Sequence, residues 1–160
     1  MTAEVISIGT ELLLGQTVDT DAAYLAKALS GVGVSVYNRA TVGDNFERAV
    51  ATFRLALSRS DMVFCIGGLG PTLDDLTRDI IAEVMDAPLV RDEALVAHLT
   101  DWFARRDYPM NDTILRQADV PTGGVPLSNP NGTAPGLWLE KDGKLVVALP
   151  GPPNEFEPMV

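Results

Sequence analysis

The sequence predicts an α/β fold with a mostly parallel sheet and an antiparallel hairpin at the edge of that sheet. Short apolar segments alternate with amphipathic segments of helical length through the first half of the chain, a pattern typical of βαβ units. Near the other end, two apolar segments flank Asp142-Gly143, a pair that favours a tight antiparallel turn. We expect a single domain over residues 1–160, because this length supports a full-sized core and no linker or repeat divides it.

The first strand and helix are predicted from apolar residues and capping signals. Apolar residues ahead of Gly9 predict a strand over residues 4–9. A polar loop follows this strand. A helix is then expected over residues 22–29, with Asp21 or Thr20 as its cap.

Two further strands and two helices complete the parallel part of the expected sheet. An apolar segment over residues 34–39 predicts the second strand, and apolar side chains at helical spacing predict a helix over residues 44–58. The uninterrupted apolar run 62–66 predicts a strand buried on both faces. The next helix is expected over residues 77–85.

The last part of the chain predicts a helix and the antiparallel hairpin. Residues 92–106 carry an apolar stripe at helical spacing, and His98 lies off its centre, which predicts a surface histidine. A short strand is expected over residues 125–127, followed by the hairpin strands 136–140 and 144–149.

Composition and charge limit the classes of partner. The net charge is −10 at pH 7 and Lys and Arg form no cluster, which argues against nucleic-acid binding. No apolar run is long enough to span a bilayer, so we expect a cytoplasmic protein that does not bind membranes. Cys65 is the single cysteine; it cannot form an internal disulfide, and a buried small hydrophobe is its expected role.

The segment after the strand 62–66 predicts the functional site. Its glycines allow positive φ angles and a close approach of the backbone to a ligand. Backbone N–H groups at a helix N-terminus bind phosphate, and carboxylate oxygens hold divalent cations. The alternative is a plain strand-to-helix connection in which Asp and Thr serve as caps. The candidate residues are Gly67, Gly68, Gly70, Thr72, Asp74, Asp75 and Thr77.

Polar residues also follow the other expected strands. Ligands of open parallel sheets bind beyond the carboxyl ends of the strands, so we expect these residues to share one crevice with the glycine-rich turn. The candidates are Glu11, Asp44, Asn129, Gly132, Thr133 and Glu155.

Several of these loops have a purely structural alternative. Asp44 is equally well explained as a helix cap. Residues 131–136 could be a turn before an edge strand, and residues 150–153 could simply end the strand before them. The leucines at 12–14 predict an anchoring hydrophobic plug or, alternatively, an oligomer contact.

Two common nucleotide motifs do not fit the glycine-rich turn. Residues 67–72 contain no lysine, so they are not a Walker P-loop, and they lack the GxGxxG spacing of a dinucleotide fingerprint. What remains is phosphate binding by backbone amides with a metal cation as the positive charge. Carboxylates on that metal could also activate a water for in-line attack.

Four motifs in this order resemble the N-terminal domain of CinA, the competence/damage-inducible protein family within the molybdopterin-binding (MoaB/MogA-like) superfamily. They are residues 8–16, 67–77, 131–136 and 150–155, and the resemblance covers essentially the whole chain. It implies a three-layer α/β/α fold with a mostly parallel sheet, and it implies hydrolysis of ADP-ribose, or a related nucleoside diphosphate sugar, to AMP and ribose 5-phosphate. It also implies a divalent metal (Mg, Mn or Co), often with potassium, and a homo-oligomer, either a dimer or a trimer.

The resemblance carries roles onto particular residues. It implies that Asp44 and Asp75 are metal-binding or catalytic residues, and it extends a catalytic role to Glu155. It also implies that Gly67, Gly68, Gly70, Thr72 and Asp74 form a phosphate-binding turn.

The chain departs from the family pattern at two positions and in length. Asp21 stands where asparagine is frequent, and Arg116 stands where lysine is usual, a change that keeps the charge and alters its geometry. Full-length CinA proteins usually continue into a nicotinamide mononucleotide deamidase domain, which is absent from residues 1–160. Two other functions stay open: a molybdopterin binder or adenylyltransferase, and a non-catalytic nucleotide-binding regulatory module.

Overall fold

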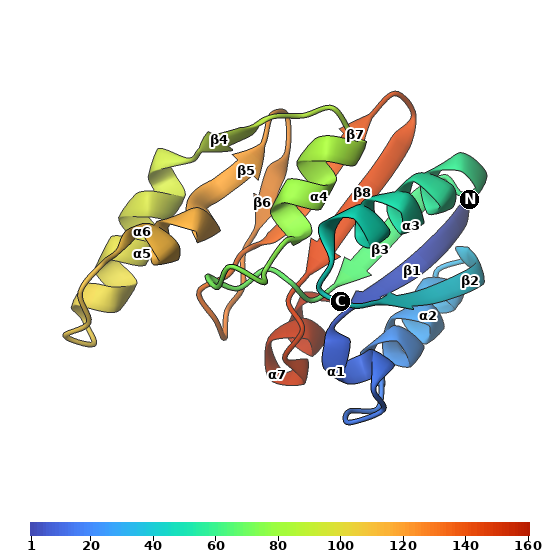
Figure 1. Cartoon of the computed structure of the whole chain (residues 1–160), viewed down its shortest axis with the longest axis horizontal. Helices are drawn as coiled ribbons and strands as arrows, with labels where there is room; N and C mark the ends of the chain where they lie inside the picture. The colour runs from blue at the N-terminus through green and yellow to red at the C-terminus, as the bar shows by residue number, and fades with distance from the viewer.

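A six-stranded sheet forms the centre of the computed structural model, which describes all residues 1–160 (Figure 1). The first four strands in spatial order are parallel to one another, and the last two are antiparallel to their neighbours. The predicted mixed sheet, with its hairpin on one side, is therefore confirmed. In spatial order the strands are β2 (Ser35–Val42), β1 (Thr2–Ile8), β3 (Met62–Ile66), β8 (Lys144–Leu149), β7 (Gly136–Lys141) and β6 (Val125–Leu127).

Helices cover both faces of the sheet and give the three layers. Apolar residues of α2 and α7 pack on one face, together with Val5 of β1, and apolar residues of α3 and α4 pack on the other, together with Ile6. The helices are α1 (Thr10–Leu13), α2 (Asp21–Gly31), α3 (Phe46–Arg59), α4 (Thr77–Val84), α5 (Glu93–Ala104), α6 (Asp112–Leu115) and α7 (Pro153–Phe156), with the 3-10 turns η1 (Arg116–Ala118) and η2 (Glu157–Met159).

Alternation along β1 decides which of its side chains face which layer. Ile6 and Ile8 belong to the core beneath α3 and α4, whereas Ala3 and Val5 belong to the core beneath α2. Side chains two residues apart on a strand share a face, so Ser7 lies on the α2 side. Cys65 is 0% exposed, which confirms its expected role as a buried small side chain.

A second, two-stranded sheet is the main element that the sequence did not predict. Its strands are β4 (Leu89–Arg91) and β5 (Asp119–Pro121), which pair antiparallel. Three-residue strands carry too little periodicity to be recognised. This sheet leads into and out of α5 and α6, which project from the end of the molecule farthest from β2 (Figure 1). His98 is exposed on α5, as expected.

In the first loop, one local prediction is wrong and another holds in part. The leucines do not form a plug, because Leu13 and Leu14 are 55% and 66% exposed; α1 is too short to turn them inward. The oligomer contact remains the prediction for them. Thr20 is the N-cap residue of α2, one of the two predicted, but its side chain makes no capping bond; Asp19 Oδ1 instead accepts from the Ala22 N–H at 3.0 Å. None of the helices combines the length and apolar character needed to cross a lipid bilayer.

Candidate functional site

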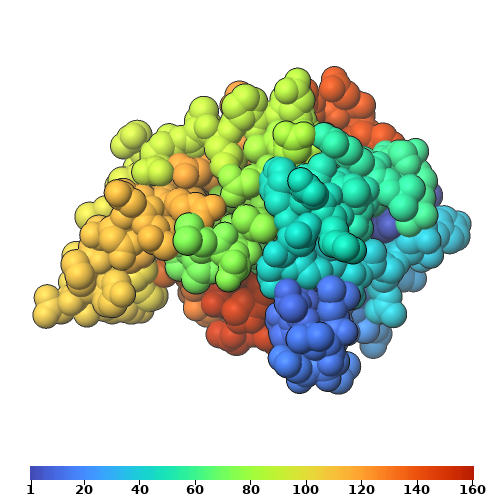
Figure 2. Space-filling model, in the orientation of Figure 1, coloured from blue at the N-terminus to red at the C-terminus, as the bar shows by residue number.

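Loops at the carboxyl ends of β1, β3 and β8 enclose a cleft of about 610 Å³. Figure 2 shows the segments that form it on one face of the molecule: the blue loop around α1, the green turn after β3 and the red α7 segment. This is the edge at which an open parallel sheet binds its ligands. The predicted residues that line the cleft are Glu11, Asp44, Gly67, Gly68, Gly70, Asp74, Asp75, Thr133 and Glu155.

The glycine-rich turn owes its shape to Gly67 and Gly68. Their φ angles of 97° and 67° lie in the left-handed region that favours glycine. A Cβ on Gly67 would also come within 2.6 Å of the Ile8 carbonyl oxygen. Thr77 is fully buried beneath the turn, where its Oγ1 donates to the Gly67 carbonyl at 2.7 Å and its N–H donates to the Gly68 carbonyl at 3.1 Å. Thr77 therefore holds the turn and does not reach the cleft surface.

The carboxylate of Asp75 is held by Thr72, a residue that was predicted to bind phosphate. The Thr72 N–H and the Thr72 Oγ1 donate to Asp75 Oδ2 at 2.8 and 2.6 Å. Asp75 Oδ1 accepts no hydrogen bond from the protein and remains available to a ligand. Thr72 itself does not line the cleft, so its contribution is to orient the carboxylate.

Asp44 supports the start of α1 and leaves the capping of α3 to its neighbour. Asp44 Oδ2 accepts from the Thr10 N–H at 3.0 Å and from Thr10 Oγ1 at 2.8 Å. The side chain of Asn45 accepts from the Arg48 N–H at 3.0 Å and caps α3. The alternative in which Asp44 caps that helix is therefore wrong. Asp44 lines the cleft, and its second carboxylate oxygen accepts no hydrogen bond from the protein.

Glu155 is held from behind by two predicted residues that do not themselves line the cleft. Asn129 Nδ2 donates to Glu155 Oε2 at 2.7 Å and to the Ala134 carbonyl at 2.9 Å. Gly132 lies so close to Glu155 Oε2 that a Cβ at this position would displace the carboxylate. Asn129 and Gly132 therefore position Glu155.

Seven carboxylates line the cleft, and no Lys, Arg or His side chain does. Burial, followed by the charges of Asp19 and Glu157, raises the pKa of Asp21 above its ordinary value. An anionic ligand in such a cleft needs a cation to offset this negative charge. The seven are Glu11, Asp19, Asp21, Asp44, Asp74, Asp75 and Glu155.

The carboxylate oxygens of the cleft fit a hard divalent cation whose remaining coordination positions are filled by a bound ligand. No three His, Cys, Asp or Glu side chains gather closely enough to hold a metal by themselves. Mg²⁺ is usually held by one or two carboxylates together with substrate phosphates. The unpartnered oxygens of Asp44 and Asp75 are the candidates for the protein's share of that coordination.

Two arginines behind the turn were not predicted as part of the site. Arg116 Nη1 donates to the Thr72 carbonyl at 3.1 Å, and its Nη2 donates to Asp79 at 3.2 Å. Arg78 is 3% exposed; its Nη1 lies 3.5 Å from the Gly70 carbonyl, while its Nε and Nη2 have no partner. Burial lowers the pKa of Arg78 to about 10. An arginine in an amphipathic helix gives no sequence signal of burial, because most such residues face solvent.

Several further polar residues line the cleft without having been predicted as site residues: Ser7, Thr17, Asp19, Thr20, Asp21 and Gln117. Ser7 carried a usable signal, because a hydroxyl within a strand buried on both faces needs a partner. Gln117 is fully buried and accepts a bond from Thr133 Oγ1 at 2.7 Å. The position of Gln117 in a short 3-10 turn gave no sequence signal that it would be buried.

The fold and the cleft define a three-layer α/β domain with a carboxylate-lined cleft at the carboxyl ends of its parallel strands. The family described as "Probable molybdopterin binding domain" matches residues 4–160, and the chain belongs to this family. A crystal structure of MoaB, a molybdopterin biosynthesis enzyme from Thermus thermophilus, superposes with a TM-score of 0.63 at 21% identity, covering 96% of this chain and 83% of that one. At that identity the likeness shows the fold alone.

Proteins of the CinA type are much more similar. A protein CinA from Thermoplasma acidophilum superposes with a TM-score of 0.91 at 38% identity, covering 99% of this chain and 94% of that one. A protein named as competence-damage inducible from Symbiobacterium thermophilum is 51% identical over 160 residues, and one from Halothermothrix orenii is 47% identical over 159. Both alignments cover 99% of this chain and 38% of the relative. The resemblance to the CinA family is confirmed, and the chain spans well under half the length of these two relatives.

Proposed function

We propose that this domain is a metal-dependent pyrophosphatase that hydrolyses ADP-ribose, or a related nucleoside diphosphate sugar, to AMP and ribose 5-phosphate. One observation carries the proposal: the cleft combines a glycine turn rich in backbone N–H groups with seven carboxylates and no basic side chain. A diphosphate can bind there only together with a cation, and the carboxylates are suited to hold one.

In this proposal some residues of the cleft bind the diphosphate and the cation, and another accepts a proton. The backbone of Gly67 to Gly70 approaches the diphosphate without hindrance from side chains. Asp44 and Asp75 present one carboxylate oxygen each for a divalent cation. When bound, such a cation would neutralise the phosphoryl oxygens and lower the pKa of a water. Glu155 Oε1 accepts the proton of the attacking water, while Asn129 holds Oε2 in place.

The test is a screen of metals against substrates. ADP-ribose, NADH, FAD and CoA are each incubated with Mg²⁺, Mn²⁺ or Co²⁺, with and without K⁺, and the products are separated by chromatography. We expect AMP and ribose 5-phosphate from ADP-ribose only when a divalent metal is present. Asp75→Ala should lower the rate by about 100-fold or more, in the range for loss of a group that stabilises the transition state. Turnover by Asp75→Ala at the wild-type rate would remove the role assigned to Asp75.

A molybdopterin-type role is the second candidate, and the family description supports it. A protein of this kind would bind molybdopterin tightly and produce no AMP from ADP-ribose. A non-catalytic regulatory module would instead bind ADP-ribose in a metal-dependent way and leave it intact. Calorimetric titration of both ligands, run beside the product assay, separates the three functions.

A further inference from the structure

The hydroxyl of Ser7 is buried in the wall of the cleft without a partner. Ser7 is 1% exposed, and its Oγ has no hydrogen-bond partner in the protein. It nevertheless lines the cleft, on the side of β1 that faces α2. Most buried hydroxyls are hydrogen-bonded, and an exception of this kind calls for an explanation. A hydrogen bond between the Ser7 hydroxyl and a bound ligand would explain it.

The start of α2 brings a second unsatisfied group to the same side. Asp21 lines the cleft, and its carboxylate accepts no hydrogen bond from the protein. Asp19 lies beside it, with one oxygen already used to cap α2. Desolvation and the charges of Asp19 and Glu157 already disfavour the ionised form of Asp21, so a phosphate group placed here would meet further repulsion.

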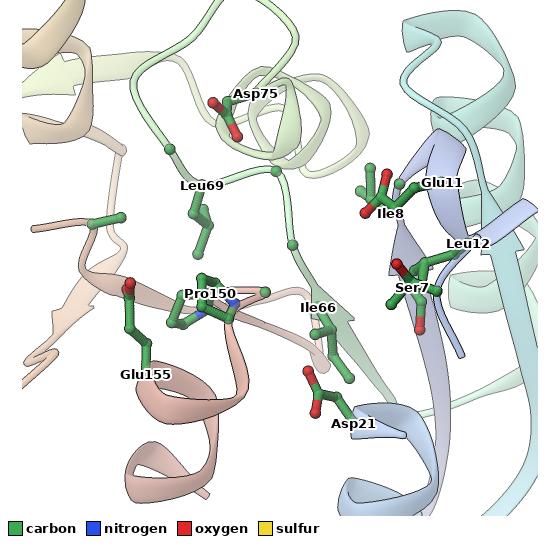
Figure 3. Close-up of a pocket in the computed structure, with 18 of the residues that line it drawn as sticks. Ser7, Ile8, Glu11, Leu12, Asp21, Ile66, Leu69, Asp75, Pro150 and Glu155 are labelled. Carbon is green, nitrogen blue, oxygen red and sulfur yellow. The ribbon is translucent and has the colours of Figure 1, made fainter. Parts of the chain in front are cut away.

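The cleft therefore has two chemically different ends. Asp21 lies at the start of α2 and Asp75 lies beside α4, on opposite sides of the sheet, with Ile66 and Leu69 between them (Figure 3). The end near Asp75 offers backbone N–H donors from the glycine turn, which suit phosphate. The end near Ser7 and Asp21 offers mainly acceptors, which suit uncharged groups that donate hydrogen bonds.

We propose that Ser7 and Asp21 form a subsite for the uncharged, hydrogen-bond-donating part of the ligand, while its phosphates lie at the glycine turn. The groups of this chemistry in a nucleotide are the ribose hydroxyls and the amino group of the base. Carboxylates recognise ribose hydroxyls in this way in other α/β nucleotide-binding folds. The inference rests on the proposed function insofar as the ligand is a nucleotide, and it assigns the orientation of that ligand across the cleft.

Binding of AMP and its analogues tests the subsite without requiring turnover. Calorimetry in the presence of Mg²⁺ compares AMP with 2′-deoxy-AMP, 3′-deoxy-AMP and IMP, on the wild type and on Ser7→Ala and Asp21→Asn. We expect the wild type to bind AMP about 10- to 100-fold more tightly than the analogue that lacks the recognised donor. Each variant should lose most of that preference and bind that analogue as the wild type does. The deoxy analogues and IMP distinguish the sugar from the base.

The variants are suited to this test because they leave the fold intact. Ser7→Ala removes a hydroxyl that has no partner, so we expect its melting temperature to equal or exceed that of the wild type. Ser30→Ala, on the exposed end of α2, is the matched control and should keep the wild-type preference. A wild type that binds AMP and all three analogues equally, or variants that keep the full preference, would overturn the subsite.

Failure of the subsite and failure of the proposed function give different results. Hydrolysis of ADP-ribose together with unchanged preferences in the variants would contradict only the subsite. Nucleotide preferences that depend on Ser7 and Asp21, without any release of AMP from ADP-ribose, would contradict only the pyrophosphatase. A wild type that binds none of the nucleotides would overturn both.

Discussion

Replacement of Gly70 by alanine would move the Asp75 carboxylate without removing it. The φ angle of Gly70 is not in the left-handed region, so alanine is compatible with the backbone. Its Cβ would, however, lie 2.7 Å from Asp75 Oδ2, whereas ordinary contacts begin at 3.4 Å. The carboxylate must therefore retreat by about 0.7 Å, the difference between these two distances. This shift strains the two bonds that Thr72 donates to it, at 2.8 and 2.6 Å.

The size of the effect follows from the displacement. A misplacement of about 1 Å in an active site can lower the rate by about 100-fold. For the shift at Asp75 we predict a fall in kcat/KM of about 10- to 100-fold, equivalent to about 1.4 to 2.7 kcal/mol of transition-state stabilisation. Weakening of the Thr72 bonds should cost no more than about 1 to 2 kcal/mol of folding free energy, because Asp75 is only half-buried.

The assay measures AMP release from ADP-ribose at saturating Mg²⁺, together with the melting temperature. Gly31→Ala is the matched control, because a Cβ there meets nothing within 4 Å and the φ angle is again not in the left-handed region. Both changes restrict the unfolded chain in the same way. A folded Gly70→Ala protein with a kcat/KM within twofold of the Gly31→Ala value would refute the dependence of activity on the position of Asp75.

Three further predictions follow from the site and the core. Asp44→Asn keeps an acceptor for Thr10 but removes the charge, so the Mg²⁺ concentration for half-maximal activity should rise at least about tenfold; an unchanged metal dependence would exclude Asp44 as a ligand. Burial raises the pKa of Cys65 from 9.0 to about 12, so a thiol reagent at pH 8 should label only the unfolded protein. On raising the pH, the thiol ionises in the unfolded protein before it ionises in the folded one. The contribution of Cys65 to the free energy of unfolding is therefore complete below pH 9 and should decline as the pH rises toward about 12. Arg78→Met removes two unpartnered N–H donors, so urea unfolding should give an unchanged or higher free energy of unfolding; a loss above about 2 kcal/mol would show that the buried guanidinium stabilises the fold.

Local patterns predicted the strands well because their signals lie among neighbouring residues. The strand Met62–Ile66 and the strand Val125–Leu127 have the predicted bounds, and β8 begins and ends where Asp142-Gly143 implied. The short strands of the second sheet were missed, since three residues carry no periodicity. Leu13 and Leu14 were assigned to the interior because apolar residues usually lie there, although the short helix α1 leaves them exposed.

Within the site, the residues of the glycine turn were identifiable from their types and order, but the structural role of each one was not. Thr72 and Thr77 have the same side chain and occur in one motif. Thr72 orients Asp75 at the rim of the cleft, whereas Thr77 holds the turn from below. Only the path of the backbone between them separates these roles, because hydrogen-bond partners depend on distances in space.

The sequence by itself determined the chain order of the six strands of the main sheet and of the helices α2 to α5, the glycine turn after β3 and the membership of a CinA-like family. Periodicity, glycine conformations and motif order are properties of adjacent residues, so they can be read without the fold. Only the tertiary structure decided that the cleft is lined by seven carboxylates and no basic side chain, that Arg78 is buried behind the turn, and that Ser7 and Asp21 both line the cleft on the α2 side. Those facts depend on the parallel register of distant strands, which brings loops separated by more than a hundred residues to one edge of the sheet.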